Sequence, residues 1–133
     1  MAIRTIPAFF FCIVALALTY CAQQNDEAIR ITERDDGSSV RLREGQVLTV
    51  ALEGNPTTGY TWEASSGVES ILQQQGEPGF EPRSNLPGAG GLVTIEFKAI
   101  KQGEGILRLI YHRSFEPGVD PLKRFEVTIA VYR

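Results

Sequence analysis

The stretch Leu92-Val93-Thr94-Ile95-Glu96-Phe97-Lys98-Ala99-Ile100 decides the fold class of this chain. From residue 93 to residue 99, apolar side chains alternate strictly with polar or charged ones. An alternation with a period of two residues is typical of a β-strand that buries one face. The sequence therefore predicts a strand over residues 92–100.

Similar short runs recur on both sides of this stretch, and clusters of Gly, Pro, Ser and Asn separate them. After residue 28, no stretch keeps the apolar spacing of three and four residues that an amphipathic helix requires. About seven strands of ordinary length predict an all-β domain, an immunoglobulin-like antiparallel β-sandwich. The further predicted strands cover residues 29–32, 40–43, 48–52, 60–64, 68–74, 106–112 and 123–132.

The composition limits the classes of function. The chain has 133 residues, which is enough for one domain and too short for two. The hydrophobic fraction of 43% is sufficient for one packed core. Its net charge of −3 disfavours nucleic-acid binding, because phosphate neutralisation supplies most of that affinity. The single histidine, His112, and the two cysteines, Cys12 and Cys21, exclude a His/Cys zinc site and a disulfide scaffold from the folded region. We expect no metal and no cofactor.

Residues 1–20 have the features of an export signal. Arg4 precedes an apolar run over residues 6–18, which is shorter than the roughly 20 helical residues that cross a bilayer. Cys21 closes this run as in bacterial lipoprotein signals, whose cysteine is acylated, although Tyr20 stands where a small residue is usual. Conventional cleavage stays an alternative. We expect an exported protein, periplasmic or attached to the cell envelope through a lipid on Cys21, with a polar tether over residues 21–27 and a folded domain over residues 28–133.

The order of the strands predicts that three long connections share one end of the sandwich. If the strands from residue 48 onward run antiparallel in chain order, alternate connections lie at the same end. Residues 54–59, 76–91 and 113–122 then come together, and the second of these is a 16-residue connection. Connections longer than about 12 to 15 residues without regular structure tend to be functional. This end is therefore predicted to be a binding edge.

The first of these connections is predicted to be stiff. Pro56 fixes its own φ, Thr57 and Thr58 have restricted χ1 angles, and Gly59 can adopt a positive φ. A rigid loop loses little entropy on binding, and it does not readily adopt the extended conformation that a protease cleaves. The alternative reading is an ordinary tight hairpin turn.

The other two connections offer different chemistry. The run Gly88-Ala89-Gly90-Gly91 precedes a strand rather than a helix, which excludes a phosphate-binding loop and predicts a flexible tip whose backbone can approach a partner. Disorder is the alternative. Arg113 and Phe115 are candidate interface anchors, since exposed aromatic and Arg side chains are common anchors; the alternative is that Phe115 folds back over the core. His112 is expected to pack or to form a hydrogen bond, not to catalyse.

The run Asn55-Pro56-Thr57-Thr58-Gly59-Tyr60 resembles the signature of chagasin-like inhibitors of papain-family cysteine peptidases. That family carries an NPTTG-aromatic loop, a Gly-rich loop and an Arg-Pro-Trp type loop, in this order, on an immunoglobulin-like sandwich. Gly88-Ala89-Gly90-Gly91 is similar to the second element. Arg113-Ser114-Phe115 is similar to the third, with Ser114 in place of the usual proline and Phe115 in place of the usual tryptophan. The resemblance covers roughly residues 29–133.

The resemblance implies a reversible, competitive inhibitor that binds papain-family peptidases. We also expect a monomer without enzymatic activity of its own. Thr57 and Thr58 are then expected near the catalytic cysteine and histidine, the Gly-rich loop along the substrate-binding side, and Arg113 and Phe115 on the other side of the cleft. Two alternatives stay open. An exported immunoglobulin-like adhesion or ligand-binding module could use the same edge, and a hydrolase would have to work with one histidine and no cysteine in the fold.

Overall fold

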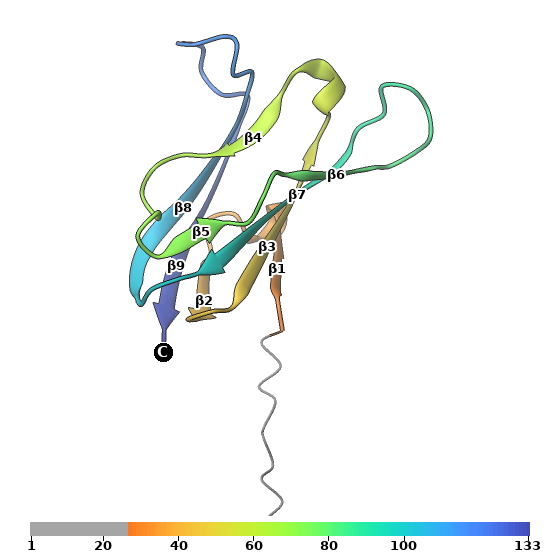
Figure 1. Cartoon of the computed structure of the whole chain (residues 1–133). Coiled ribbons are helices and arrows are strands. Elements are labelled where there is room, and N and C mark those ends of the chain that lie inside the picture. Colours follow the sequence, from red (N-terminus) through yellow and green to blue (C-terminus); the bar gives the residue numbers. More distant parts are fainter. Residues whose placement is uncertain (1–26) are drawn as a thin grey trace, which may run out of the picture.

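The computed structural model describes residues 27–133. The predicted export signal, Cys21 and most of the predicted tether therefore lie outside the described residues. Within residues 27–133 the chain forms strands and two short 3-10 turns, η1 and η2, and no α-helix (Figure 1). The elements in chain order are β1 (Ile29–Thr32), η1 (Glu33–Asp35), β2 (Ser39–Arg43), β3 (Val47–Gly54), η2 (Pro56–Thr58), β4 (Thr61–Ala64), β5 (Leu72–Gln74), β6 (Gly79–Pro82), β7 (Gly91–Ala99), β8 (Gly103–His112) and β9 (Lys123–Tyr132).

Two sheets form a sandwich around one core, which confirms the predicted fold class. One sheet has the order β1-β3-β7-β5, with β6 also pairing with β7, and the other has the order β2-β9-β8-β4. Alternate residues of the central strands point inward, and in β7 these are Val93, Ile95, Phe97 and Ala99, as the alternation predicted. Trp62 of β4 is only 4% exposed and closes the core near the loops.

The pairing of the first two strands differs from the wholly antiparallel prediction. β1 pairs in parallel with β3, and β2 pairs in parallel with β9. The short turn η1 lets the chain leave one sheet and join the other, so β1 and β2 each become an edge strand of a different sheet. From β3 onward the pairings are antiparallel.

The predicted strand over residues 68–74 is mostly a turn. Only β5 is extended, and the carbonyl of Val68 accepts hydrogen bonds from the amides of both Ile71 and Leu72. Val68, Ile71 and Leu72 are all buried. Their spacing of three and four residues suits one compact turn better than a strand, and the turn packs all three side chains into the core.

The predicted 16-residue connection over residues 76–91 contains a strand, β6, which pairs with β7. Pro82 is tolerated there because β6 is an edge strand and the proline lacks only an outward-facing N–H. Gly91 is correspondingly a buried residue of β7 and not part of a flexible tip. A Cβ atom on Gly91 would collide with the carbonyl oxygen of Glu81, so only glycine allows the two strands to approach this closely.

The predicted gathering of the connections is confirmed. Residues 55–60, 83–90 and 113–122 lie at the upper end of the sandwich in Figure 1, while β1 begins at the lower end. The lower position of the first described residues is fixed by the Gln46 side chain, whose amide donates to the carbonyl of Glu27 over 2.8 Å. The sandwich is thus polarised, with the loops at one end and the start of the domain at the other.

Candidate functional site

Hydrogen bonds between the loops join the three predicted motifs into one surface. The side-chain amide of Asn55 in the first loop donates to the carbonyl of Gly88 in the second loop over 3.0 Å. The guanidinium of Arg113 in the third loop donates through Nε to the carbonyl of Thr58 in the first over 3.1 Å. The first loop therefore lies in the middle and is tied to both neighbours.

The first loop, residues 55–60, is closed on itself. Asn55 caps the turn η2, because its Oδ1 accepts hydrogen bonds from the amide and the hydroxyl of Thr57, at 3.2 and 2.6 Å. The hydroxyl of Thr58 donates to the Asn55 carbonyl over 2.6 Å, and the amide of Gly59 donates to the Pro56 carbonyl over 3.0 Å. Gly59 ends the turn in the left-handed region with φ 81°. The predicted stiffness thus has a specific hydrogen-bonded cause.

A stack of side chains connects this loop to the core. Trp62 and Tyr111 pack with ring centroids 5.0 Å apart, Tyr111 and Tyr60 follow at 5.2 Å, and the Arg113 guanidinium lies 4.5 Å from the Tyr60 ring centroid. We call Trp62, Tyr111, Tyr60 and Arg113 the aromatic column. Trp62 and Tyr111 are opposite each other in the register of β4 and β8. The column supports the loop end on buried rings, which lose few rotameric states on binding.

Tyr111 also holds the first loop directly. Its hydroxyl accepts a hydrogen bond from the amide of Asn55 over 2.9 Å. A buried ring thereby satisfies a main-chain donor that the turn itself leaves unpaired. Tyr111 was not among the predicted site residues. The strand pattern places its ring on the core face but gives no register to β4, so the contact could not be read from the sequence.

Arg113 is largely engaged within the protein. Besides the Thr58 carbonyl and the Tyr60 ring, its Nη1 donates to the Glu116 carboxylate over 3.2 Å. Phe115 differs, because its side chain is 67% exposed and does not fold back over the core. A Cβ placed on Gly59 would come within 3.0 Å of the Phe115 ring, so the exposed ring lies directly against the first loop. Arg113 holds the third loop in place, and Phe115 is the side chain that it presents.

The second loop is shorter than predicted and presents its backbone. Residues 83–90 connect β6 and β7, and the amide of Arg83 donates to the carbonyl of Gly90 across its base. Gly88 has φ 75° with no atom near its missing Cβ, and Ala89 follows it at the tip. Gly90 passes close to the first loop, since a Cβ there would lie 3.5 Å from the carbonyl oxygen of Gly54.

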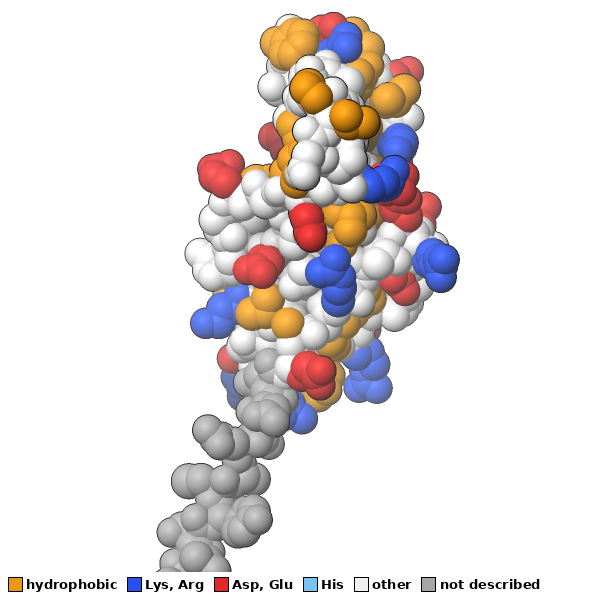
Figure 2. Space-filling model, turned by 90° about the vertical axis from the view of Figure 1, so that its right-hand side faces the viewer, with side chains coloured by type: hydrophobic (Ala, Val, Ile, Leu, Met, Phe, Trp, Pro, Cys, Tyr) orange, Lys and Arg blue, Asp and Glu red, His pale blue; other side chains and the backbone are white. Residues whose placement is uncertain are grey.

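Exposed apolar side chains gather at the same end. Leu86, Phe115, Val119 and Leu122 have exposed fractions of 61% to 74%, higher than any other large hydrophobic side chain among residues 27–133. Figure 2 shows hydrophobic side chains on the upper end of the molecule. Exposed apolar side chains grouped at one end of a domain are typical of an interaction surface. Leu86, Val119 and Leu122 were not predicted, because an isolated apolar residue in a loop cannot be told from a buried one by sequence alone.

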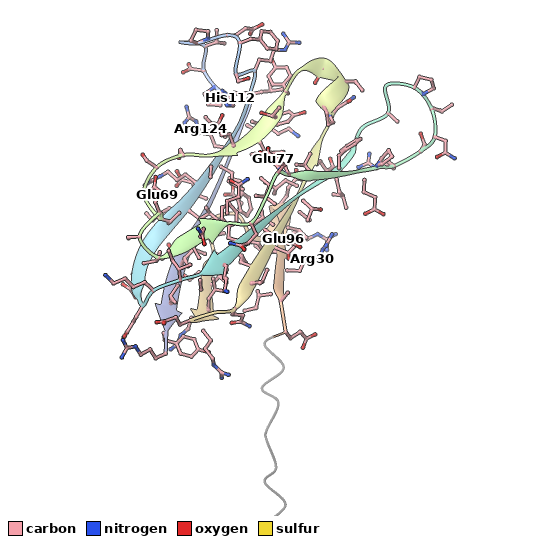
Figure 3. The ribbon with its side chains drawn as sticks, viewed as in Figure 1. Arg30, Glu69, Glu77, Glu96, His112 and Arg124 are labelled. Atoms are coloured by element: carbon pink, nitrogen blue, oxygen red, sulfur yellow. The ribbon has the colours of Figure 1, made fainter. Side chains whose placement is uncertain are left out.

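His112 forms a hydrogen bond, as expected. Its Nε2 lies 2.6 Å from an oxygen of Glu63, across the β4–β8 pair. His112 is the last residue of β8 and lies at the base of the third loop (Figure 3). In the described part of the chain, no group of three or more His, Cys, Asp or Glu side chains could hold a metal ion. The same residues contain no helix long and apolar enough to span a membrane.

Comparison with known proteins points to one family. The family model described as Chagasin family peptidase inhibitor I42 matches residues 41–129. Amoebiasin-1 of Entamoeba histolytica is 30% identical over 95 residues, which cover 68% of this chain and 87% of amoebiasin-1.

Two solved structures share the fold. The cysteine protease inhibitor EhICP2 from Entamoeba histolytica superposes with a TM-score of 0.69 at 24% identity, covering 79% of this chain and 96% of its own. The chain named PbICP-C, solved in complex with falcipain-2, gives a TM-score of 0.53 at 20% identity, covering 80% of this chain and 90% of its own.

Proposed function

This chain belongs to the chagasin family of peptidase inhibitors, and we propose that it inhibits papain-like cysteine peptidases reversibly and competitively by placing its three loops in their active-site cleft. The observation that carries this proposal is the joining of the loops by the Asn55–Gly88 and Arg113–Thr58 hydrogen bonds. These bonds make one rigid wedge from segments distant in sequence. The relatives support the peptidase class, since one is named a cysteine protease inhibitor and another was solved with falcipain-2.

The closed first loop explains how a peptide chain can occupy a protease cleft without being cleaved. Cleavage requires an extended segment at the catalytic centre, whereas Pro56, Thr57 and Thr58 form a 3-10 turn. Extending this turn would break the capping bonds of Asn55 and the bond from Gly59 to Pro56. Each such bond contributes about 1 kcal/mol, so several together oppose the conformation that hydrolysis needs. Because the turn is already formed, binding costs little conformational entropy.

The second and third loops add contacts on either side of this turn. The Gly88 and Gly90 carbonyls and the Ala89 amide are bonded within the protein. The remaining main-chain groups of these residues, the amides of Gly88 and Gly90 and the carbonyl of Ala89, can pair with an extended edge of the peptidase. Phe115 supplies an exposed aromatic ring, and aromatic rings are frequent anchors of protein interfaces. Ser114 is exposed beside it and adds no apolar surface. In this arrangement Arg113 acts by positioning the third loop, and Phe115 acts by contact.

The chain is proposed to act by binding alone, without enzymatic activity. The family is one of peptidase inhibitors. His112, the only histidine in the sequence, has its Nε2 bonded to Glu63. No cysteine lies between residues 27 and 133.

We also propose that the protein is exported and monomeric, and that a lipid on Cys21 attaches it to the cell envelope. The apolar run over residues 6–18, with Cys21 shortly after it, supports export and the lipid. The polarity of the domain is compatible with it, because β1 begins at the end opposite the loops, so attachment there leaves the loops free (Figure 1). Intact mass of the protein purified from membranes tests the proposal. A mature chain that begins at Cys21 and carries the mass of acyl groups is expected, and an unmodified cysteine would contradict it.

A steady-state assay against papain tests the inhibitor proposal. Competitive inhibition is expected, with recovery of peptidase activity on dilution. Replacing Phe115 with Trp is expected to lower the inhibition constant, because the larger ring buries more apolar surface. No inhibition at micromolar protein would refute the proposal, and an unchanged constant for Phe115→Trp would remove Phe115 as an anchor.

A further inference from the structure

A groove of about 490 Å³ opens on one side of the sandwich, just below the loops. It lies between β4, the edge strand of one sheet, and β5 and β6, the edge strands of the other sheet. Buried Trp62 and Val93 contribute to its lining, and partly exposed Phe80 and Tyr60 stand beside them. The groove therefore exposes apolar surface that the two sheets do not cover.

The charged groups of the groove all have one sign. Glu63 and Glu77 line it, and no Lys or Arg from residues 27–133 does. Glu77 lies on the connection between β5 and β6, beside β4 (Figure 3), and makes no ion pair with another residue in the range 27–133. Glu63 has His112 as its partner. Its carboxylate lies on the face of β4 opposite buried Trp62, so a segment that carries a Lys or Arg side chain complements Glu77.

The strands on both sides of the groove have unpaired edges. Among the strands of residues 27–133, β4 pairs only with β8, and β6 pairs only with β7. In an antiparallel pair, successive residues alternately direct their main-chain groups toward the partner strand and away from it. The amide of Ser65 donates to Arg108 of β8, and the amide of Arg83 donates to Gly90 beside β7. Counting back along each strand, the main-chain N–H and C=O groups of Trp62 and Phe80 therefore point away from β8 and β7, toward the free edges. An extended chain can pair with such an edge.

The groove is continuous with the proposed inhibitory surface. Pro56 of the first loop and Ser114 of the third loop also line it. A peptidase that holds these loops in its cleft therefore brings the rim of that cleft to the mouth of the groove.

We propose that the groove is a second contact site, which takes an extended surface segment of the target peptidase outside its catalytic cleft, with a Lys or Arg side chain at Glu77. This inference rests on the proposed inhibitor function. It gives the inhibitor a means of selecting among peptidases that share the same catalytic centre, because surface segments vary more than catalytic residues.

Three variants test the contact through inhibition of papain. Phe80→Ala removes the apolar wall, and Glu77→Lys reverses the charge; each is expected to raise the inhibition constant about tenfold. The effect of Glu77→Lys should shrink as salt is added, because salt screens exposed charges. Glu96→Lys is the matched control: it makes the same charge change on the outer face of β7 (Figure 3) and should leave the constant within about twofold.

Photo-crosslinking gives a readout that does not depend on stability. A benzophenone side chain at position 80 should crosslink to papain, through a peptide that contains Lys or Arg, and one at position 96 should not. Unchanged constants for Phe80→Ala and Glu77→Lys, or no crosslink from position 80, would overturn the second contact site. If the Phe115→Trp variant still gains affinity in that case, the inhibitor proposal stands. If the unmodified chain does not inhibit papain, both proposals fail.

Discussion

Replacing Gly59 with Ala should weaken inhibition about tenfold and should also cost the fold about 1 kcal/mol. Gly59 ends the turn η2 with φ 81°, and its amide bonds to the Pro56 carbonyl over 3.0 Å. A methyl group at this position would lie 3.0 and 3.1 Å from two carbon atoms of the Phe115 ring. The substitution thus disturbs the first loop and the third-loop anchor together.

The expected loss of stability follows from the backbone. An L-residue in the left-handed region costs about 1 to 2 kcal/mol, and the smaller entropy of the unfolded chain returns about 0.4 to 1 kcal/mol. The net loss is about 1 kcal/mol. Phe115 is exposed and can rotate away from the methyl group, so the contact adds little to this loss. Rotation moves the ring away from its position against the first loop, and we expect the inhibition constant to rise about tenfold, equivalent to about 1.4 kcal/mol.

Gly45→Ala is the matched control. Gly45 has φ 91°, and no atom of residues 27–133 lies within 4 Å of its missing Cβ. It lies in the β2–β3 turn at the end opposite the loops. Urea unfolding should show a similar loss of stability for both variants, whereas only Gly59→Ala should change the inhibition constant of papain. Equal constants for the two variants would refute the reasoning, because the effect would then come from stability and not from the geometry of the loop.

Three further predictions concern other parts of the domain. Tyr111→Phe keeps the ring but leaves the amide of Asn55 without its acceptor, so thermal unfolding should show a loss of about 1 to 2 kcal/mol, with a raised inhibition constant; wild-type values would remove Tyr111 as a support of the first loop. Gly91→Ala forces β6 away from β7 and should lower the free energy of unfolding by more than about 2 kcal/mol in urea; an unchanged midpoint would contradict the tight packing of these strands. A hydrogen bond from the amide of Gly67 lowers the pKa of the Glu69 carboxyl below its ordinary value of 4.5, so its stabilisation is present above that pH and is lost as the pH falls through the lowered pKa. Glu69→Gln should therefore lose less stability than the wild type on acidification below about pH 4.5, and parallel pH profiles would contradict this.

Much of the fold could be predicted because the signals are local. The alternation over residues 93–99 identifies a half-buried strand from its own side chains, and the antiparallel order of the later strands places the three loops at one end. Pro56 and Gly59 likewise restrict the backbone of the first loop whatever surrounds it. These features depend only on a residue and its near neighbours in the chain.

The tertiary structure decided what depends on register and on contacts between distant segments. β6 forms from a Gly- and Pro-containing stretch because β7 offers it an unpaired edge, and main-chain pairing needs no particular side chain. The hydrogen bond from the Asn55 amide to the Tyr111 hydroxyl joins residues 56 positions apart, so no local sequence pattern could predict it. Arg113 was predicted to be an exposed anchor. Its contacts with Thr58 and Tyr60 depend on the packing of the two sheets, so the sequence alone could not predict them. The sequence specified the stiffness of the first loop and the order of the three loops. The packing of the two sheets decided which side chains support the binding surface and which are left exposed to form it.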